Sequence, residues 1–185
     1  MRTTLLATAS LIGLAGTPAF AGMPAPLLIA DAQAAIIAAS KAIPNEIETV
    51  WVVDKAGDPL AMLHPACAPT LGIPGALGKA VVSAWSGQSS SAFDPRVTPA
   101  AANNMTIAAM LSEHASGWKT FVPSQGAEPI KRLDNEGNPV TIGAVGCGGG
   151  TPDQDETCAQ IGVAAIKGAQ LHVTDIVRQK AGHRG

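Results

Sequence analysis

The stretch that decides the fold runs from Pro139 to Ile166 and reads PVTIGAVGCGGGTPDQDETCAQIGVAAI. Residues 140–145 predict a short buried strand, and a glycine-rich turn follows it. Thr151 stands where a helix N-cap belongs, Pro152 takes the first helical position, and Gln154 comes three residues after the threonine. This order lets the side chains and backbones of Thr151 and Gln154 cap one another reciprocally. The sequence therefore predicts that a helix begins at Thr151.

The predicted helix has one face of mostly small apolar side chains: Cys158, Ile161, Gly162, Ala165 and Ile166. Such a face lets a helix lie close against a sheet. A glycine turn before a helix N-terminus can also bind anions. Three acidic residues of the first turn, Asp153, Asp155 and Glu156, already occupy the positive field of that terminus. We therefore favour a structural turn over a phosphate or carboxylate site.

The rest of the chain alternates helical and extended patterns. In chain order these predict a helix over 28–43, a hairpin of 48–53 and 59–64, a helix over 76–85, a short helix over 103–111, and extended segments at 118–122 and 129–133. The predicted fold class is α+β. We expect a two-layer domain with a mainly antiparallel sheet of about five strands and with helices packed on one side.

The first residues have the pattern of a secretory signal peptide. Arg2 precedes an apolar core over residues 5–14, and Ala19-Phe20-Ala21 forms an A-x-A cleavage site. We therefore expect a signal peptide over 1–21, one domain over 22–170 and a C-terminal extension over 171–185. The expected location of the mature chain is the periplasm or the medium.

The composition excludes some classes of partner. The 12 basic and 14 acidic residues give a formal net charge of −2, and aromatic residues make up only 3%. Neither a basic surface nor a set of stacking side chains for nucleic acid is present. The sequence has no second long apolar run, so we expect no membrane insertion.

Three segments carry a resemblance to a known family. They are IGAVGCGGGTPDQDETCAQIGVAA near the C-terminus, VWVVDKAGDPLA (50–61) and GALGKAVVSAW (75–85). In this order the segments resemble the GlcG/HbpS family of haem-binding proteins, which includes the C-terminal domain of the PduO corrinoid adenosyltransferase. The resemblance implies a profilin-like fold, haem as the cofactor with a corrinoid as second choice, and a homo-oligomer. It also implies that Lys79 is the lysine of the family's helix.

Cys67, Cys147 and Cys158 all remain after signal cleavage, and thiols tend to pair in an oxidising compartment. Cys147 ends the predicted strand, and Cys158 lies on the sheet-facing side of the helix that folds back. This pair is therefore the preferred disulfide, with Cys67–Cys158 as the alternative.

The chain has no C-x-x-C-H, so any haem would be bound without covalent attachment. His64 ends a strand and His114 lies at a predicted helix end, and either is a candidate iron ligand. Met62 and Met105 are weaker candidates that are more simply explained as core, and His172 and His183 are expected to be solvated. Lys79 is the basic residue most expected to contact a ligand. Other basic side chains that could pair with haem propionates are Arg96, Lys119, Lys131 and Arg132.

Three functions are consistent with these residues. The first is an exported, oligomeric protein that binds haem or a related tetrapyrrole for storage, sensing or scavenging. The second is an accessory subunit of a periplasmic redox complex that has lost the tetrapyrrole site, because His64-Pro65 replaces the arginine-aspartate pair common in the family. The third is haem degradation or small-molecule redox catalysis. We rank catalysis last because no acid-base arrangement is visible: Asp54 and Asp58 are more simply explained as turn residues.

Overall fold

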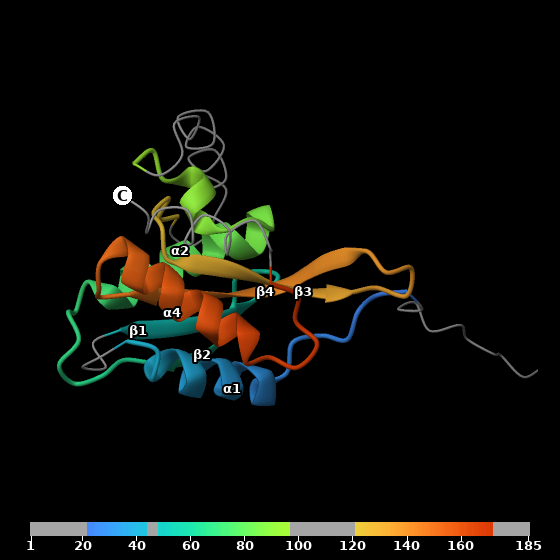
Figure 1. Ribbon diagram of the computed structural model, residues 1–185, viewed down its shortest axis with the longest axis horizontal. Coiled ribbons are helices and arrows are strands. Elements are labelled where there is room, and N and C mark those ends of the chain that lie inside the picture. Colours follow the sequence, from blue (N-terminus) through green and yellow to red (C-terminus); the bar gives the residue numbers. More distant parts are fainter. Residues whose placement is uncertain (1–21, 44–47, 97–120, 172–185) are drawn as a thin grey trace, which may run out of the picture.

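A four-stranded antiparallel sheet forms the centre of the computed structural model, which describes residues 22–43, 48–96 and 121–171 (Figure 1). Its strands are β1 (Thr49–Asp54), β2 (Pro59–Leu63), β3 (Ala127–Leu133) and β4 (Pro139–Gly148), in the spatial order β2-β1-β4-β3. The α+β class and the antiparallel sheet are confirmed. The described part of the chain has four strands, one fewer than the approximate number expected.

Tight turns close the two hairpins of the sheet. Between β1 and β2, the Asp54 carboxylate accepts a hydrogen bond from the Asp58 N–H at 2.9 Å, and Gly57 takes a positive φ of 80°. Between β3 and β4, the Asp134 carboxylate accepts bonds from the Glu136 and Asn138 N–H groups. Aspartate favours such turns because its side chain can bond the backbone two to four residues ahead. Asp54 and Asp58 are therefore turn residues.

Helices α1 (Ile29–Ser40) and α4 (Pro152–Ala164) pack against each other and against one face of the sheet (Figure 1). Gly162 of α4 lies where the two helices are close, because a Cβ there would lie 3.4 Å from the Ala35 carbonyl oxygen and from Ala39 Cβ. The core on this face is made of small and β-branched side chains, chiefly Ala32, Ala35, Ala39, Val50, Val52, Val145, Cys147, Cys158, Ala159 and Val163. The close approach of α4 follows from small residues. Cys158, Gly162 and Ile166 of the predicted face are buried, but Ile161 and Ala165 are exposed, and Ala159 and Val163 are buried in their place.

Helix α2 (Gly72–Ser86) covers the opposite face of the sheet, where Val53 and Ala144 pack against Ala80 and Ala84. The expectation that all helices lie on one side is therefore wrong. The reason can be seen in β1, where Val52 and Val53 are consecutive and both have no exposed surface. Successive side chains of a strand point to opposite faces, so two adjacent buried valines require cover on both.

Two element boundaries in the structure differ from those predicted from the sequence. The strand β4 continues through Gly146 to Gly148, which the sequence assigned to the turn. A Cβ at Gly146 would lie 2.8 Å from Ala80 Cβ, so glycine here permits the close contact with α2. Helix α2 begins at Gly72 rather than near residue 76. Pro74 lies in its first turn, where backbone N–H groups have no helical partner, so the proline costs the helix no hydrogen bond. A short 3-10 helix, η1 (Ser90–Phe93), was not predicted.

Several predictions lie outside the described residues: the signal peptide over 1–21, the helix over 103–111, most of the segment at 118–122, and nearly all of the C-terminal extension. Those predictions stand as predictions. Among the helices of the described part, none has the length and apolar character needed to cross a membrane.

Candidate functional site

The start of α4 has the predicted cap. The Thr151 hydroxyl accepts a hydrogen bond from the Gln154 N–H at 3.4 Å, and the Gln154 carboxamide oxygen accepts one from the Thr151 N–H at 2.9 Å. Thr151 is extended, with φ −74° and ψ 159°, and Pro152 is the first helical residue. The two bonds satisfy backbone donors that a helix N-terminus otherwise leaves open. The cap fixes the point where the acidic first turn meets the sheet.

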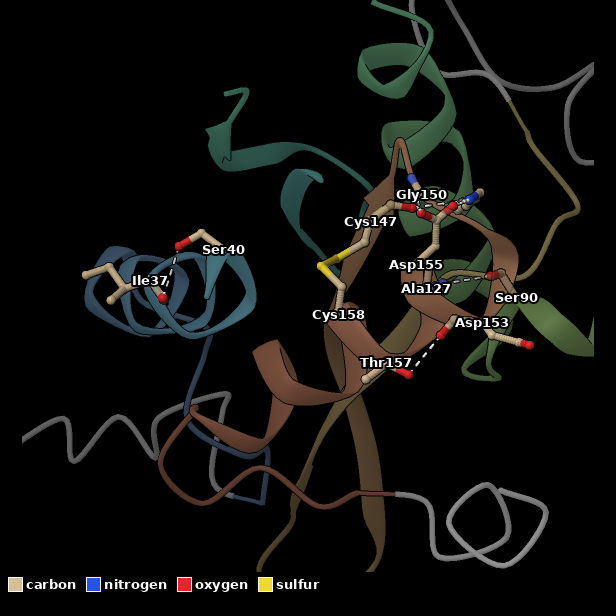
Figure 2. The surroundings of a disulfide bond; sticks show 11 residues. Ile37, Ser40, Ser90, Ala127, Cys147, Gly150, Asp153, Asp155, Thr157 and Cys158 are labelled. Carbon is tan, nitrogen blue, oxygen red and sulfur yellow. Dashed lines mark hydrogen bonds and ion pairs between the residues drawn. A yellow bond between two sulfur atoms is a disulfide. The ribbon is translucent and has the colours of Figure 1, made fainter. Parts of the chain in front are cut away.

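A disulfide ties α4 to the end of β4. Cys147 and Cys158 are bonded, with Cα atoms 6.1 Å apart, and both are fully buried (Figure 2). The preferred pairing is confirmed, and the Cys67–Cys158 alternative is wrong. Cys67 is exposed and carries a free thiol. The disulfide brings the first turn of α4 beside the last residues of the central strand.

Lys79 lies in the interior beside this junction, only 7% exposed. Its ammonium group is 2.5 Å from Asp155 Oδ2 of α4 and donates a hydrogen bond to the Cys147 carbonyl at 3.2 Å. A Cβ at Gly126 would lie 2.8 Å from the same ammonium nitrogen, so the backbone of residue 126 closes over the pair. Lys79 thus joins α2, β4 and α4. Its direct contact with a ligand stays a prediction.

Glu48 precedes β1 and lies against the same turn. The residue is 2% exposed, and within the described part of the chain neither of its carboxyl oxygens has a hydrogen bond of normal geometry. Gly150, whose N–H donates to Asp155 Oδ1 at 3.0 Å, has no room for a Cβ because Glu48 Oε1 occupies that space. Burial, and then the neighbouring Asp155, raise the pKa of Glu48 to about 8, while the Gly150 N–H and Lys79 act more weakly in the opposite direction.

A second polar network lies along η1 and the segment before β3. The Gln125 carboxamide bonds Glu156 and Asp153 of α4, and the Ser89 hydroxyl bonds Glu156 at 3.3 Å. The acidic side chains at the start of α4 therefore bind protein groups. This supports the interpretation of the glycine turn as structural rather than anion-binding.

Asp94 anchors the end of η1 to the same network. It accepts two hydrogen bonds from the Arg96 guanidinium, at 2.9 and 2.6 Å, and one from the Gln125 N–H at 3.1 Å. The Arg96 hydrogen bonds, the largest cause, hold the pKa of Asp94 down at about 2. Arg96 therefore has a protein partner.

His64 lies at the end of the edge strand β2. Its Nδ1 and Thr49 Oγ1 share a hydrogen bond of 2.8 Å across to β1, which fixes the ring and leaves ligation of a metal to Nε2. Met62, two residues earlier and therefore on the same face, pairs with Trp51 and is 45% exposed. Helix α2 packs on β1, β4 and β3 rather than on this edge strand. At this edge of the sheet His64 is thus half-buried and Met62 is exposed.

The remaining candidates do not gather around His64. Arg132 pairs with Asp31 at 3.0 Å and donates to the Ala25 and Pro26 carbonyls, so it ties β3 to the start of α1. Lys131 lies on β3 at the far edge of the sheet. His114, His172, His183, Met105 and Lys119 lie outside the described residues. Their roles stay predictions.

Sequence reasoning missed three residues of these arrangements: Thr49, Asp155 as a partner of Lys79, and Glu48. Lys79 and Asp155 are 76 positions apart, and no local spacing reveals such a pair. Glu48 offered one weak signal, since it stands two positions before the apolar run of residues 50–53. Such a position is commonly buried when the strand is covered on both faces.

The fold and the residues described define an α+β domain with one antiparallel sheet between two helical layers, a disulfide at the end of its central strand and a histidine at its edge. The family model described as "Haem degrading protein HbpS-like" matches residues 28–164. The chain belongs to this HbpS-like family. The resemblance stated from the sequence is confirmed.

Solved structures share the fold. A structure described as a PduOC–haem complex has 23% identity and a TM-score of 0.63, and the match covers 80% of this chain and 99% of that one. A double mutant of HbpS from Streptomyces reticuli has 20% identity and a TM-score of 0.59, covering 90% and 99%. Protein ORFY of Klebsiella pneumoniae has 23% identity and a TM-score of 0.57, covering 78% and 92%. A comparison with curated proteins gave no match.

Proposed function

We propose that the mature chain binds haem, or a related tetrapyrrole such as a corrinoid, without covalent attachment, and that His64 is the axial ligand. The observation that carries this proposal is the hydrogen bond between His64 Nδ1 and Thr49 Oγ1, which orients the ring at the end of β2. Ligating histidines commonly have such a partner on their other ring nitrogen. Membership of the HbpS-like family supports the same ligand class.

Two exposed apolar side chains, Met62 on β2 and Leu71 before α2, are candidates to contact an apolar macrocycle bound at His64. Met62 shares the face of His64, and Leu71 is 83% exposed. Burial of exposed apolar side chains against a porphyrin ring would contribute about 25 cal/mol for each Å² removed from water. His64 therefore supplies the ligating nitrogen, and the neighbouring apolar side chains supply contact area. His114 is the alternative ligand, as its position in the sequence suggests.

A hemin titration of residues 22–185 tests this proposal. We expect a saturable Soret band in the wild type and a weaker band in His64→Ala, with an intermediate loss in Thr49→Val because the ring is no longer oriented. His114→Ala tests the alternative ligand, and His183→Ala is a matched control in the predicted tail. Absence of a saturable spectral change in the wild type, or a band that neither His64→Ala nor His114→Ala weakens, would overturn the assignment.

We also propose that the protein is exported, forms homo-oligomers and serves in haem storage, sensing or scavenging. The buried Cys147–Cys158 disulfide supports an oxidising compartment, and the pattern of residues 1–21 supports signal-dependent export. Fractionation of the source cells and size-exclusion chromatography test location and assembly. Co-purification of a redox partner without any tetrapyrrole would instead favour the accessory subunit.

Haem degradation is the second candidate, and the description of the matching family favours it. Its test is turnover of hemin with a reductant in the presence of catalase, which removes peroxide-driven bleaching. An enzyme is supported if the Soret band is lost even in the presence of catalase and if this loss is slower in His64→Ala. Binding without turnover leaves the binding protein as the function.

A further inference from the structure

Among the described residues, two carboxyl groups and a single ammonium group meet where the start of β1, α2 and α4 come together. Glu48 is the residue before β1, Asp155 lies in the first turn of α4, and Lys79 lies in the middle of α2. All three are at least nine-tenths buried, with exposed fractions of 2%, 4% and 7%. If both carboxyl groups were ionised, the one buried ammonium group would leave one buried negative charge uncompensated.

The hydrogen bonds show which carboxyl group lacks compensation. Asp155 has a partner on each oxygen. The Lys79 ammonium donates to Oδ2, and the Gly150 N–H donates to Oδ1, the second of these bonds being drawn in Figure 2. Among the described residues, neither Glu48 oxygen has a hydrogen bond of normal geometry, although the Gly150 N–H and the Asp155 carboxyl group lie beside it. A buried carboxylate without a donor costs several kcal/mol, and a group so placed takes up a proton instead.

We propose that Glu48, which precedes β1, and Asp155 in the first turn of α4 share one proton, and that its loss in alkaline solution is a pH switch that weakens the docking of α4. With the proton in place, Glu48 is neutral and can donate to its neighbour. Without it, two carboxylates face one ammonium group. Within the part of the chain that the structure describes, the charged groups that face Glu48 are Asp155 from α4 and Lys79 from α2. Glu156, next along α4, is engaged by Gln125 and Ser89.

The direction of the pH dependence follows from proton binding. In the unfolded chain the Glu48 carboxyl has its ordinary pKa of 4.5, and burial and Asp155 raise the pKa to about 8 in the folded chain. Between these pH values the folded chain holds a proton that the unfolded chain has lost. The stabilising contribution is therefore full below about pH 4.5 and is lost as the pH rises to about 8.

Denaturant unfolding across this pH range tests the switch in wild type and in Glu48→Gln, which keeps the shape and a donor but cannot titrate. One proton corresponds to about a tenfold rise in the unfolding equilibrium constant per pH unit. We expect this slope in the wild type and in the matched control Glu136→Gln, an exposed turn residue, and a flatter dependence in Glu48→Gln. Equal slopes in Glu48→Gln and the wild type would refute the proposal.

Carbon-13 NMR of the wild type tests the same point without any variant. The side-chain carboxyl carbon of Glu48 should titrate with a midpoint near 8. A Glu48 midpoint near 4.5 would overturn the shared proton. The result is independent of haem binding, so the two proposals succeed or fail separately.

Discussion

Removal of the Cys147–Cys158 disulfide should lower the free energy of unfolding by about 3 kcal/mol. The two cysteines are 11 positions apart, and a cross-link that closes a loop of this size removes about 9 cal/mol/K of entropy from the unfolded chain. At 25 °C this corresponds to roughly 2.8 kcal/mol. Both side chains are fully buried, so a double alanine variant also loses core packing and should be somewhat less stable than the reduced wild type.

The assay is guanidinium unfolding of four samples: oxidised wild type, reduced wild type, Cys147→Ala/Cys158→Ala, and Cys67→Ser. Cys67→Ser is the matched control, because its thiol is exposed and free. We expect reductant to shift the midpoint of the wild type but not that of the double variant, and Cys67→Ser to behave like the wild type. If reduction shifts the midpoint of the double variant, or if Cys67→Ser loses as much stability, this account of the cross-link is wrong.

Other changes test the contacts of α2 and α4 by the same unfolding assay. Lys79→Met should lower the free energy of unfolding by about 3 kcal/mol or more, because it leaves a buried carboxylate without its cation. The control Lys41→Met changes an exposed lysine and should cost little, so equal effects would contradict the buried pair. Gly146→Ala should lower the free energy of unfolding by about 2 kcal/mol, because its Cβ would press on the α2 backbone. Gly75 has open space around it, so Gly75→Ala should be neutral or stabilising. A Gly146→Ala variant as stable as the wild type would show that α2 can move away. Thr151→Ala should lower the free energy of unfolding by about 1 kcal/mol through loss of the cap, whereas Thr151→Ser should keep most of the cap's stabilisation. Equal losses in both variants would argue against the hydroxyl hydrogen bond.

The Lys79 result bears on function as well as stability. If Lys79→Met folds, is destabilised and still binds hemin like the wild type, then the lysine acts through its contact with Asp155 rather than through a ligand. A lowered hemin affinity at equal stability would instead support the direct contact that the family resemblance implies. The two outcomes are separated by measuring unfolding and titration on the same preparations.

The strands and helices of the described chain could largely be read from the sequence because their signals are local. Thr151, Pro152 and Gln154 specify the start of α4 within four residues, and Asp54 with Gly57 specifies the first hairpin turn. The disulfide was predictable because a strand and the following helix must fold back on one another across a short turn. One boundary error comes from interpreting Gly146 as a turn residue, whereas it belongs to β4.

The candidate site was predictable only in part. His64 stood out in the sequence as a candidate, but its partner Thr49 follows from the register of β1 against β2, which sets these residues opposite each other. Lys79 was identified from the family's helix, yet the sequence could not show that it meets Asp155. Long-range contacts of this kind depend on which face of the sheet each helix covers.

The sequence by itself determined the α+β class, the order of the elements, the capped start of α4 and the preferred cysteine pair, because each follows from residues close together in the chain or from turn chemistry. Only the tertiary structure decided that α2 covers the opposite face from α1 and α4, and that Glu48, Lys79 and Asp155 meet in one buried place. The physical reason is that burial and charge compensation are properties of neighbours in space, and it is those neighbours that set the protonation of Glu48.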